Sequence, residues 1–184
     1  MKALFHLAII AKCLALLVWT GGMVFFAFCA APLAFQPEVI SVTGGTHVSG
    51  LIVNAMLTRF TWWQAVCAAV LITALVEEIR QAEVARRRRW AQLLVALAMT
   101  GLLVWYGFVV GPRMRELRAE IGDFNAPAAQ ASPQWEEFDA LHRRYVRLMS
   151  LNLFLGAGLF VFVVAMTPSA HRDRDRGMLR SIGI

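Results

Sequence analysis

The chain has 184 residues, of which 59% are hydrophobic and only 16% are charged. Soluble domains average roughly 45–50% apolar and about 25% charged residues, so this is not the composition of an ordinary water-soluble domain. The formal net charge of +6 does not indicate nucleic-acid binding, because the basic residues lie beside apolar segments, where they favour lipid headgroups. The length suits one domain, so residues 1–184 are treated as a single transmembrane domain.

Four segments are apolar and long enough to cross a bilayer as helices. They lie at about residues 4–31, 61–78, 90–111 and 147–167. The third is the clearest, because residues 90–110 contain no charged side chain and span about 30 Å as a helix. Pro32 predicts that the first span ends at Ala31, since the residue before a proline is pushed out of helical geometry. This first apolar run is longer than a signal-peptide core, so we expect the span to be retained.

The stretch between the first two spans has its own pattern. Pro37 and Gly44–Gly45 predict a connector. Residues 47–60 then place apolar side chains at helical spacing, with a polar edge that includes Asn54. This pattern predicts an interfacial amphipathic helix that leads into the second span.

Spans three and four are connected by a segment that is also mostly helical. Residues 113–121 continue the third helix beyond the membrane. Ser132–Pro133 is typical of a helix start, with a capping hydroxyl followed by proline in the first turn. The sequence therefore predicts an extramembrane helical hairpin with an Ala/Pro-rich tip at residues 125–133. The fold class is an all-α integral membrane four-helix bundle with these two additions.

Basic residues flanking the spans predict the orientation. If the amino terminus is cytoplasmic, ten basic residues flank the spans on that side and seven on the other. This excess favours both termini in the cytoplasm. The run Arg86–Arg89 is the strongest determinant, and it is also expected to bind anionic lipid headgroups.

Lys12 is the most costly residue by position, because it lies inside the first apolar span. The simpler interpretation is that its long side chain reaches the headgroups. The alternative hypothesis is an ion pair between spans one and two, with Glu77 or Glu78 as the partner.

A stripe on the fourth helix carries most of the remaining polar groups. Its members are spaced to share one face, and they are His142, Tyr145, Met149, Asn152 and Gly156. One interpretation is helix–helix contact, with the Asn152 amide bonded to a neighbouring helix. The other is a ligand or ion pocket that opens at the extracytoplasmic face, with His142 at its mouth.

The sequence offers no positive case for an enzyme, since it lacks a phosphate-binding glycine loop, a nucleophile–base pair and zinc-ligand spacing. His47 and His142 fall on the same expected side of the membrane and are the metal-ligand candidates. They match no known ligand spacing, so no metal or cofactor is expected.

Several short strings together resemble the transmembrane-protein-205-like family. They begin at Trp19, Ala31, His47, Gly111, Phe138 and Leu151, and their order spans roughly residues 13–165. The resemblance implies a four-helix integral membrane protein, with bacterial relatives grouped as a domain of unknown function and eukaryotic relatives linked to drug tolerance. It adds Trp19, Gly22, Pro32, Pro112 and Arg113 to the structural or pocket candidates. A more distant likeness is to copper-resistance-type and haem-dependent membrane proteins.

These observations predict a non-enzymatic, multi-pass protein of the bacterial cytoplasmic (inner) membrane. It would bind or help to move a small solute, or stabilise a membrane complex. The alternative is a haem- or copper-dependent membrane redox protein. Expected partners are membrane lipids, a second copy of the chain or another membrane protein, and no nucleic acid.

Overall fold

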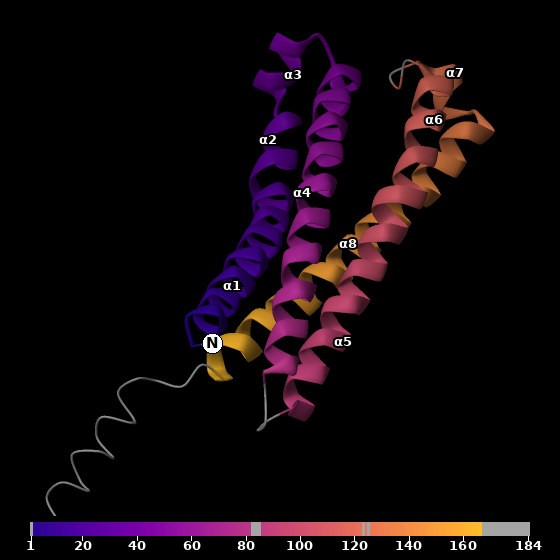
Figure 1. Cartoon of the computed structure of the whole chain (residues 1–184). Coiled ribbons are helices and arrows are strands. Elements are labelled where there is room, and N and C mark those ends of the chain that lie inside the picture. Colours follow the sequence, from indigo (N-terminus) through magenta and orange to yellow (C-terminus); the bar gives the residue numbers. More distant parts are fainter. Residues whose placement is uncertain (1, 82–85, 123, 125, 167–184) are drawn as a thin grey trace, which may run out of the picture.

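The computed structural model describes residues 2–81, 86–122, 124 and 126–166, and these are helical apart from short turns (Figure 1). Four helical stretches there are long and apolar enough to cross a membrane: Leu7–Ala34, Thr46–Arg80, Arg86–Ile121 and Pro133–Ala165. The prediction of an all-α, four-span fold is thereby confirmed.

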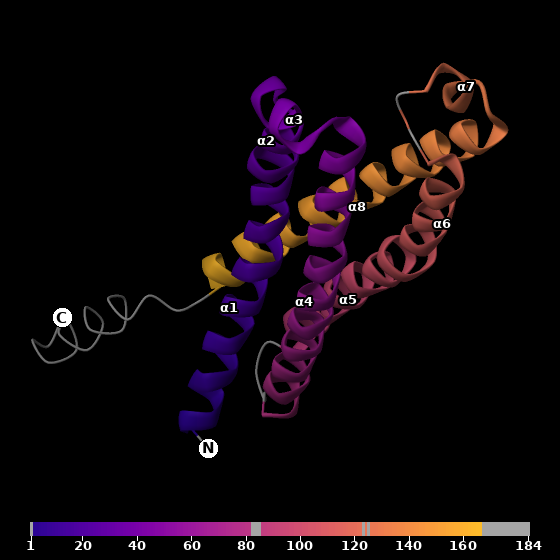
Figure 2. The same ribbon diagram turned by 90° about the horizontal axis from the view of Figure 1, so that it is seen from above.

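The described residues form ten helical elements, of which α3 and α7 lie outside these four stretches. In chain order they are α1 (Lys2–Phe25), the π-helical turn η1 (Phe26–Ala30), α2 (Ala31–Ala34), α3 (Pro37–Thr43), α4 (Thr46–Arg80), α5 (Arg86–Leu103), the π-helical turn η2 (Val104–Val110), α6 (Gly111–Ile121), α7 (Pro127–Gln130) and α8 (Pro133–Met166). Figures 1 and 2 show α1 and α4 side by side, with α5 beside α4 and α8 crossing behind them. Away from the amino-terminal end, α6 and the start of α8 lean away from α1 and α4.

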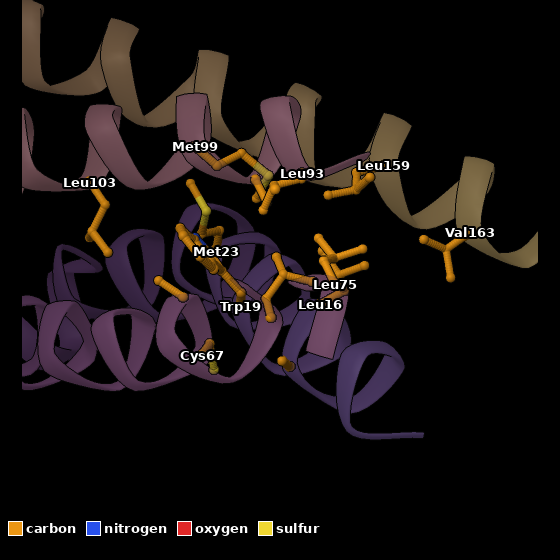
Figure 3. Packing of buried hydrophobic residues seen from close by; sticks show 14 of the residues in the cluster. Leu16, Trp19, Met23, Cys67, Leu75, Leu93, Met99, Leu103, Leu159 and Val163 are labelled. Carbon is orange, nitrogen blue, oxygen red and sulfur yellow. The ribbon is translucent and has the colours of Figure 1, made fainter. Parts of the chain in front are cut away.

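The helices pack around a core of large apolar side chains (Figure 3). Leu16, Trp19, Leu71, Met99 and Leu103 are fully or almost fully buried and come from α1, α4 and α5. Many other large apolar residues are exposed on the outside of the bundle. A helix that is hydrophobic on all sides suits a bilayer, where lipid covers the outer face.

Two prolines lie inside helices instead of ending them. The expected end of the first span at Ala31 is wrong, because the helix continues through Pro32 to Ala34. The π-helical turns η1 and η2 each end two residues before a proline, at Ala30 before Pro32 and at Val110 before Pro112. A proline cannot donate a backbone hydrogen bond and crowds the preceding turn, and a widened turn accommodates both effects.

The connector before the second span also differs from the prediction. The expected separate interfacial helix over residues 47–60 is instead the first part of α4, a single helix of 35 residues. No glycine or proline occurs between Leu51 and Arg80, so nothing in the sequence interrupts the helix. At about 1.5 Å per residue α4 is roughly 52 Å long, which exceeds the hydrocarbon layer, so part of it projects from the membrane.

The predicted helical hairpin is present, with α6 and α8 as its arms and α7 near its tip. The Ser132 hydroxyl accepts a hydrogen bond from the Trp135 backbone N–H at 3.2 Å, which caps α8 as expected. Across the arms, Arg113 donates two hydrogen bonds to the Glu137 carboxylate at 2.9 and 3.1 Å.

A buried ion pair joins α1 to α4 near the amino-terminal end. The Lys12 ammonium lies 2.6 and 2.8 Å from the two Glu78 carboxylate oxygens, and the residues are only 5% and 3% exposed. Arg89 of α5 donates a 2.6 Å hydrogen bond to the Glu78 backbone carbonyl. The structure thus shows an ion pair between Lys12 and Glu78, as the alternative hypothesis predicted, and not a lysine that reaches the headgroups. Glu77 lies outside this cluster and contacts Arg80 and Gln81.

Removing one partner of this pair should destabilise the bundle. We expect Glu78→Gln to lower the free energy of unfolding by about 3 kcal/mol, because it leaves the Lys12 charge buried without a counter-charge. The loss should be much smaller in a Lys12→Met background. Thermal unfolding can be followed by reaction of the buried Cys67 thiol with a fluorophore, after replacement of Cys13 and Cys29. Glu77→Gln is the matched control, and equal losses in both Lys12 backgrounds would contradict the prediction.

Candidate functional site

A cavity of about 490 Å³ lies where the hairpin leans away from α1 and α4. Small-molecule sites usually have about 300–1,000 Å³, so the volume suits a ligand. Its walls come from α1, η1, α2, α4, η2, α6 and α8, and the two π-helical turns both contribute. Sequence positions from Met23 to Leu153 therefore meet around one space.

The inner part of the cavity is apolar. Its side chains come from five separate elements and include Met23, Phe26, Leu57, Phe108 and Leu153. Trp62 and Phe108 form one side, with their rings in an edge-to-face arrangement 5.2 Å apart. Because Trp62 is 62% and Phe108 39% exposed, this side borders the surface that faces lipid.

The outer part of the cavity is cationic. It is lined by Arg115 and Arg118 of α6 together with His142 and Tyr145 of α8, and none of the described lining residues is acidic. The Arg118 guanidinium lies over two rings, 4.8 Å from the Phe124 centroid and 5.4 Å from that of Phe138. Such cation–π contacts hold the guanidinium in place and leave its N–H donors available.

Gly50 of α4 provides the space into which Arg118 reaches. A Cβ atom at this position would lie only 2.4 Å from Arg118 Nη1. The guanidinium therefore approaches the α4 backbone closely, from the opposite wall of the cavity. Any larger residue at position 50 would displace it.

The carboxylates of the hairpin are used elsewhere. Arg113 forms ion pairs with Glu116, Glu120 and Glu137 at 3.4, 4.0 and 2.9 Å. None of the described acidic residues lies within ion-pair distance of Arg118. Arg113 and Arg118 of α6 thus have different surroundings, the first outside the cavity among carboxylates and the second inside it among aromatic rings.

The two histidines named as metal-ligand candidates belong to one aromatic cluster at the outer end. His47 packs against Phe124 with ring centroids 6.1 Å apart, and His142 stacks on Phe138 at 6.2 Å. The phenyl rings of Phe124 and Phe138 are themselves 5.1 Å apart. Within the described ranges no group of three or more His, Cys, Asp or Glu side chains is placed to hold a metal ion.

A buried polar network lies directly beneath the cavity. The Tyr106 hydroxyl donates to Gln64 Oε1 at 3.1 Å, and the Asn152 amide donates to the Met99 carbonyl at 3.0 Å and to the Tyr106 hydroxyl at 3.4 Å. Tyr145 packs edge to face on Tyr106, with 5.4 Å between the ring centroids. This network links α4, α5, η2 and α8 at a depth where lipid offers no hydrogen bond.

The stripe on the fourth helix serves both purposes that the sequence left open. His142, Tyr145 and Met149 line the cavity, whereas Asn152 bonds to the neighbouring helix. A Cβ at Gly156 would lie 2.7 Å from Thr20 Oγ1, so this glycine allows close packing of α8 on α1. The upper part of the stripe is thus a cavity wall and the lower part a helix contact.

The other candidates lie in three places. Asn54 lines the cavity, while Pro32 and Pro112 lie in the first turns of α2 and α6, two helices that contribute other residues to its walls. Trp19 is a core residue, and Gly22 packs so closely on Phe60 that a Cβ would lie 2.4 Å from the ring. The Lys12–Glu78 pair lies at the other end of the bundle, separated from the cavity by the core.

Sequence reasoning missed several residues that shape the cavity. Arg115 and Arg118 were counted only as topology determinants, and Gly50 was not singled out. Arg115 and Arg118 are three residues apart on a helix, which is a weak signal that both side chains share one face. Gln64 in an otherwise apolar span was the stronger missed signal, since an amide there needs a partner.

Comparison with known proteins bears on this architecture. No protein of curated function and no solved structure shows a significant match to the chain. The family described as a domain of unknown function (DUF4149) matches residues 14–123, which include the second half of α1 and all of α4, α5 and α6. The resemblance to the transmembrane-protein-205-like family stays a prediction. Because the match covers more than half of the 184 residues, the chain belongs to the DUF4149 family.

Proposed function

We propose that this protein is a non-enzymatic, multi-pass membrane protein that binds a small amphiphilic molecule in the cavity between α4, α6 and α8. The single observation that carries the proposal is the polarity of that cavity, which changes from apolar inside to cationic outside. An amphiphile has the same division between its chain and its head group. Nothing in the described geometry favours the haem or copper alternative.

The position of the cavity relative to the bilayer supports this proposal. The exposed Arg59 and the buried Glu78 are 19 residues apart on α4, about 29 Å, which is close to the hydrocarbon thickness. Trp62 lies three residues after Arg59, at the level where indoles favour the interface. The cavity is lined by α4 residues from Gly50 to Trp62, so it crosses this boundary.

A ligand can reach the cavity from the lipid. The exposed faces of Trp62 and Phe108 form part of its wall, so an alkyl chain passes between apolar surfaces on its way in. The head group meanwhile stays at the level of the hairpin, outside the hydrocarbon. This route avoids burying a polar head group in lipid, which would cost several kcal/mol.

The same reasoning extends to orientation. We propose that the protein lies in a bacterial inner membrane, with the hairpin and the cavity mouth outside the cytoplasm and Arg86–Arg89 inside. The excess of flanking basic residues on the Arg86–Arg89 side supports this orientation. Of those residues, the four arginines of the carboxy-terminal tail lie outside the described part of the chain.

Filling the cavity should abolish ligand binding. Val53 lines the cavity, and we expect Val53→Trp to weaken binding of a dansyl-labelled fatty alcohol at least about tenfold, which corresponds to roughly 1.4 kcal/mol. Binding can be measured in phosphatidylcholine nanodiscs as saturable energy transfer from tryptophan to dansyl. Val66→Trp, on the lipid-facing side of the same helix, is the matched control and should bind normally. Equal binding by both variants would contradict the proposal.

Orientation can be tested by thiol labelling in intact cells. In a background without Cys13, Cys29 and Cys67, a membrane-impermeant maleimide should label Ala128→Cys at the hairpin tip. Gln81→Cys, an exposed site at the other end of α4, should react only after permeabilisation. The reverse pattern would show that the hairpin is cytoplasmic.

A further inference from the structure

We infer that the amphiphile carries an anionic head group, a carboxylate or a phosphate, and that Arg118 and Arg115 bind it. This inference rests on the proposed function and specifies the class of ligand. It comes from the distribution of charge around the cavity and from the space that the fold reserves for one guanidinium.

The first step is the charge imbalance at the cavity mouth. Arg115 and Arg118 both line it, and no acidic residue does so among the lining positions of the described chain. Yet α6 is not short of carboxylates, since Glu116 and Glu120 both lie within ion-pair distance of Arg113, outside the cavity. The fold therefore directs the acidic groups away from the cavity and leaves positive charge inside it.

The second step is the state of Arg118 itself. Its guanidinium is half-buried between Phe124 and Phe138, and no carboxylate of the described residues pairs with it. A partly desolvated charge without a counter-ion is costly. The five N–H donors of a guanidinium match a carboxylate or phosphate in two-pronged geometry, so an anion at this position removes the cost.

The third step is the direction in which Arg118 points. A Cβ atom at position 50 would overlap Arg118 Nη1, so this orientation of the side chain requires glycine there. The guanidinium therefore lies across the cavity and against α4. Arg115 lies one turn earlier on the same side of α6 and is more exposed, so it borders the mouth. A head group at Arg118 is thus within reach of a second cation.

The fourth step is the length of the space. Gly50 and Thr61 both line the cavity and are 11 positions apart on α4, a distance of about 16 Å along a helix. A head group held near Gly50 leaves room for an alkyl chain that extends past Leu57 to Met23 and Leu153, in the hydrocarbon layer. Both a free fatty acid and an anionic phospholipid have this chemistry.

The test compares three dansyl-labelled amphiphiles of one chain length, with a carboxylate, a hydroxyl or a trimethylammonium head group. They are added to the full chain in phosphatidylcholine nanodiscs. We expect the carboxylate to bind about tenfold or more tightly than the hydroxyl, as hydrogen bonds to charged groups provide. Arg118→Gln should abolish this preference. Gly50→Ala should reduce it without any change of charge, because it displaces the guanidinium.

Arg144→Gln is the matched control, since Arg144 is exposed on α8 and does not line the cavity. It should keep the preference of the unmodified protein. Equal affinity for the carboxylate and hydroxyl probes, with Val53→Trp still weakening both, would overturn the inference and leave the proposed function intact. Absence of saturable binding by every probe would overturn the proposed function itself.

Competition identifies the source of the anion. Displacement of the carboxylate probe by oleate indicates a free fatty acid, and displacement by phosphatidylglycerol indicates a phospholipid; either result supports the inference. Displacement by inorganic phosphate alone would overturn the inference, because it shows that the ligand needs no alkyl chain. Displacement by none of these compounds would also overturn it, because it shows that no anion is bound at Arg118.

Discussion

Inside a bilayer the protein itself must satisfy every polar group, because lipid tails neither accept nor donate hydrogen bonds. Three such groups determine how these helices meet. Glu78 pairs with Lys12 and receives Arg89 on its carbonyl, which joins α1, α4 and α5. Higher in the bundle, Gln64 and Asn152 meet at the Tyr106 hydroxyl and join α4 to η2 and α8. The leucine, methionine and tryptophan core fills the space between these points but does not by itself select one register, since lipid is as apolar as the core.

Beyond the Tyr106 network the protein no longer has to satisfy every polar group by itself, and there the helices lie further apart. The helices leave the hydrocarbon, so their polar groups contact water and α6 and α8 diverge from α4. The π-helical turns η1 and η2, the second of which contains Tyr106, each end two residues before a proline and line the cavity. π-helical turns are rare and occur frequently at functional sites. The DUF4149 match ends at residue 123, so α8, which supplies His142 and Tyr145, completes the cavity from outside the matched region.

The sequence predicted what depends on local pattern and on the cost of isolated polar groups. The four spans, the hairpin and the inward position of Asn152 follow from apolar length, capping residues and a buried amide. The break expected at Pro32 and the separate helix over residues 47–60 were wrong. In the first case a π-helical turn accommodates the proline, and in the second no residue interrupts α4. Arg118 was missed as a cavity residue, because its role depends on Gly50, which lies 68 positions away in the chain and whose contact leaves no local signal.

Arg113 and Arg118 show how one short helix separates structural from binding charge. They are five residues apart on α6, so they point about 140° away from each other around the helix axis. Carboxylates from both hairpin arms surround Arg113 on the outer side, which stiffens the hairpin. If Arg118 were paired in the same way, only the more exposed Arg115 would leave positive charge at the cavity mouth. Because rings support it instead, its charge remains available to a ligand at the depth where the hydrocarbon ends, and this position also determines which way an amphiphile must enter.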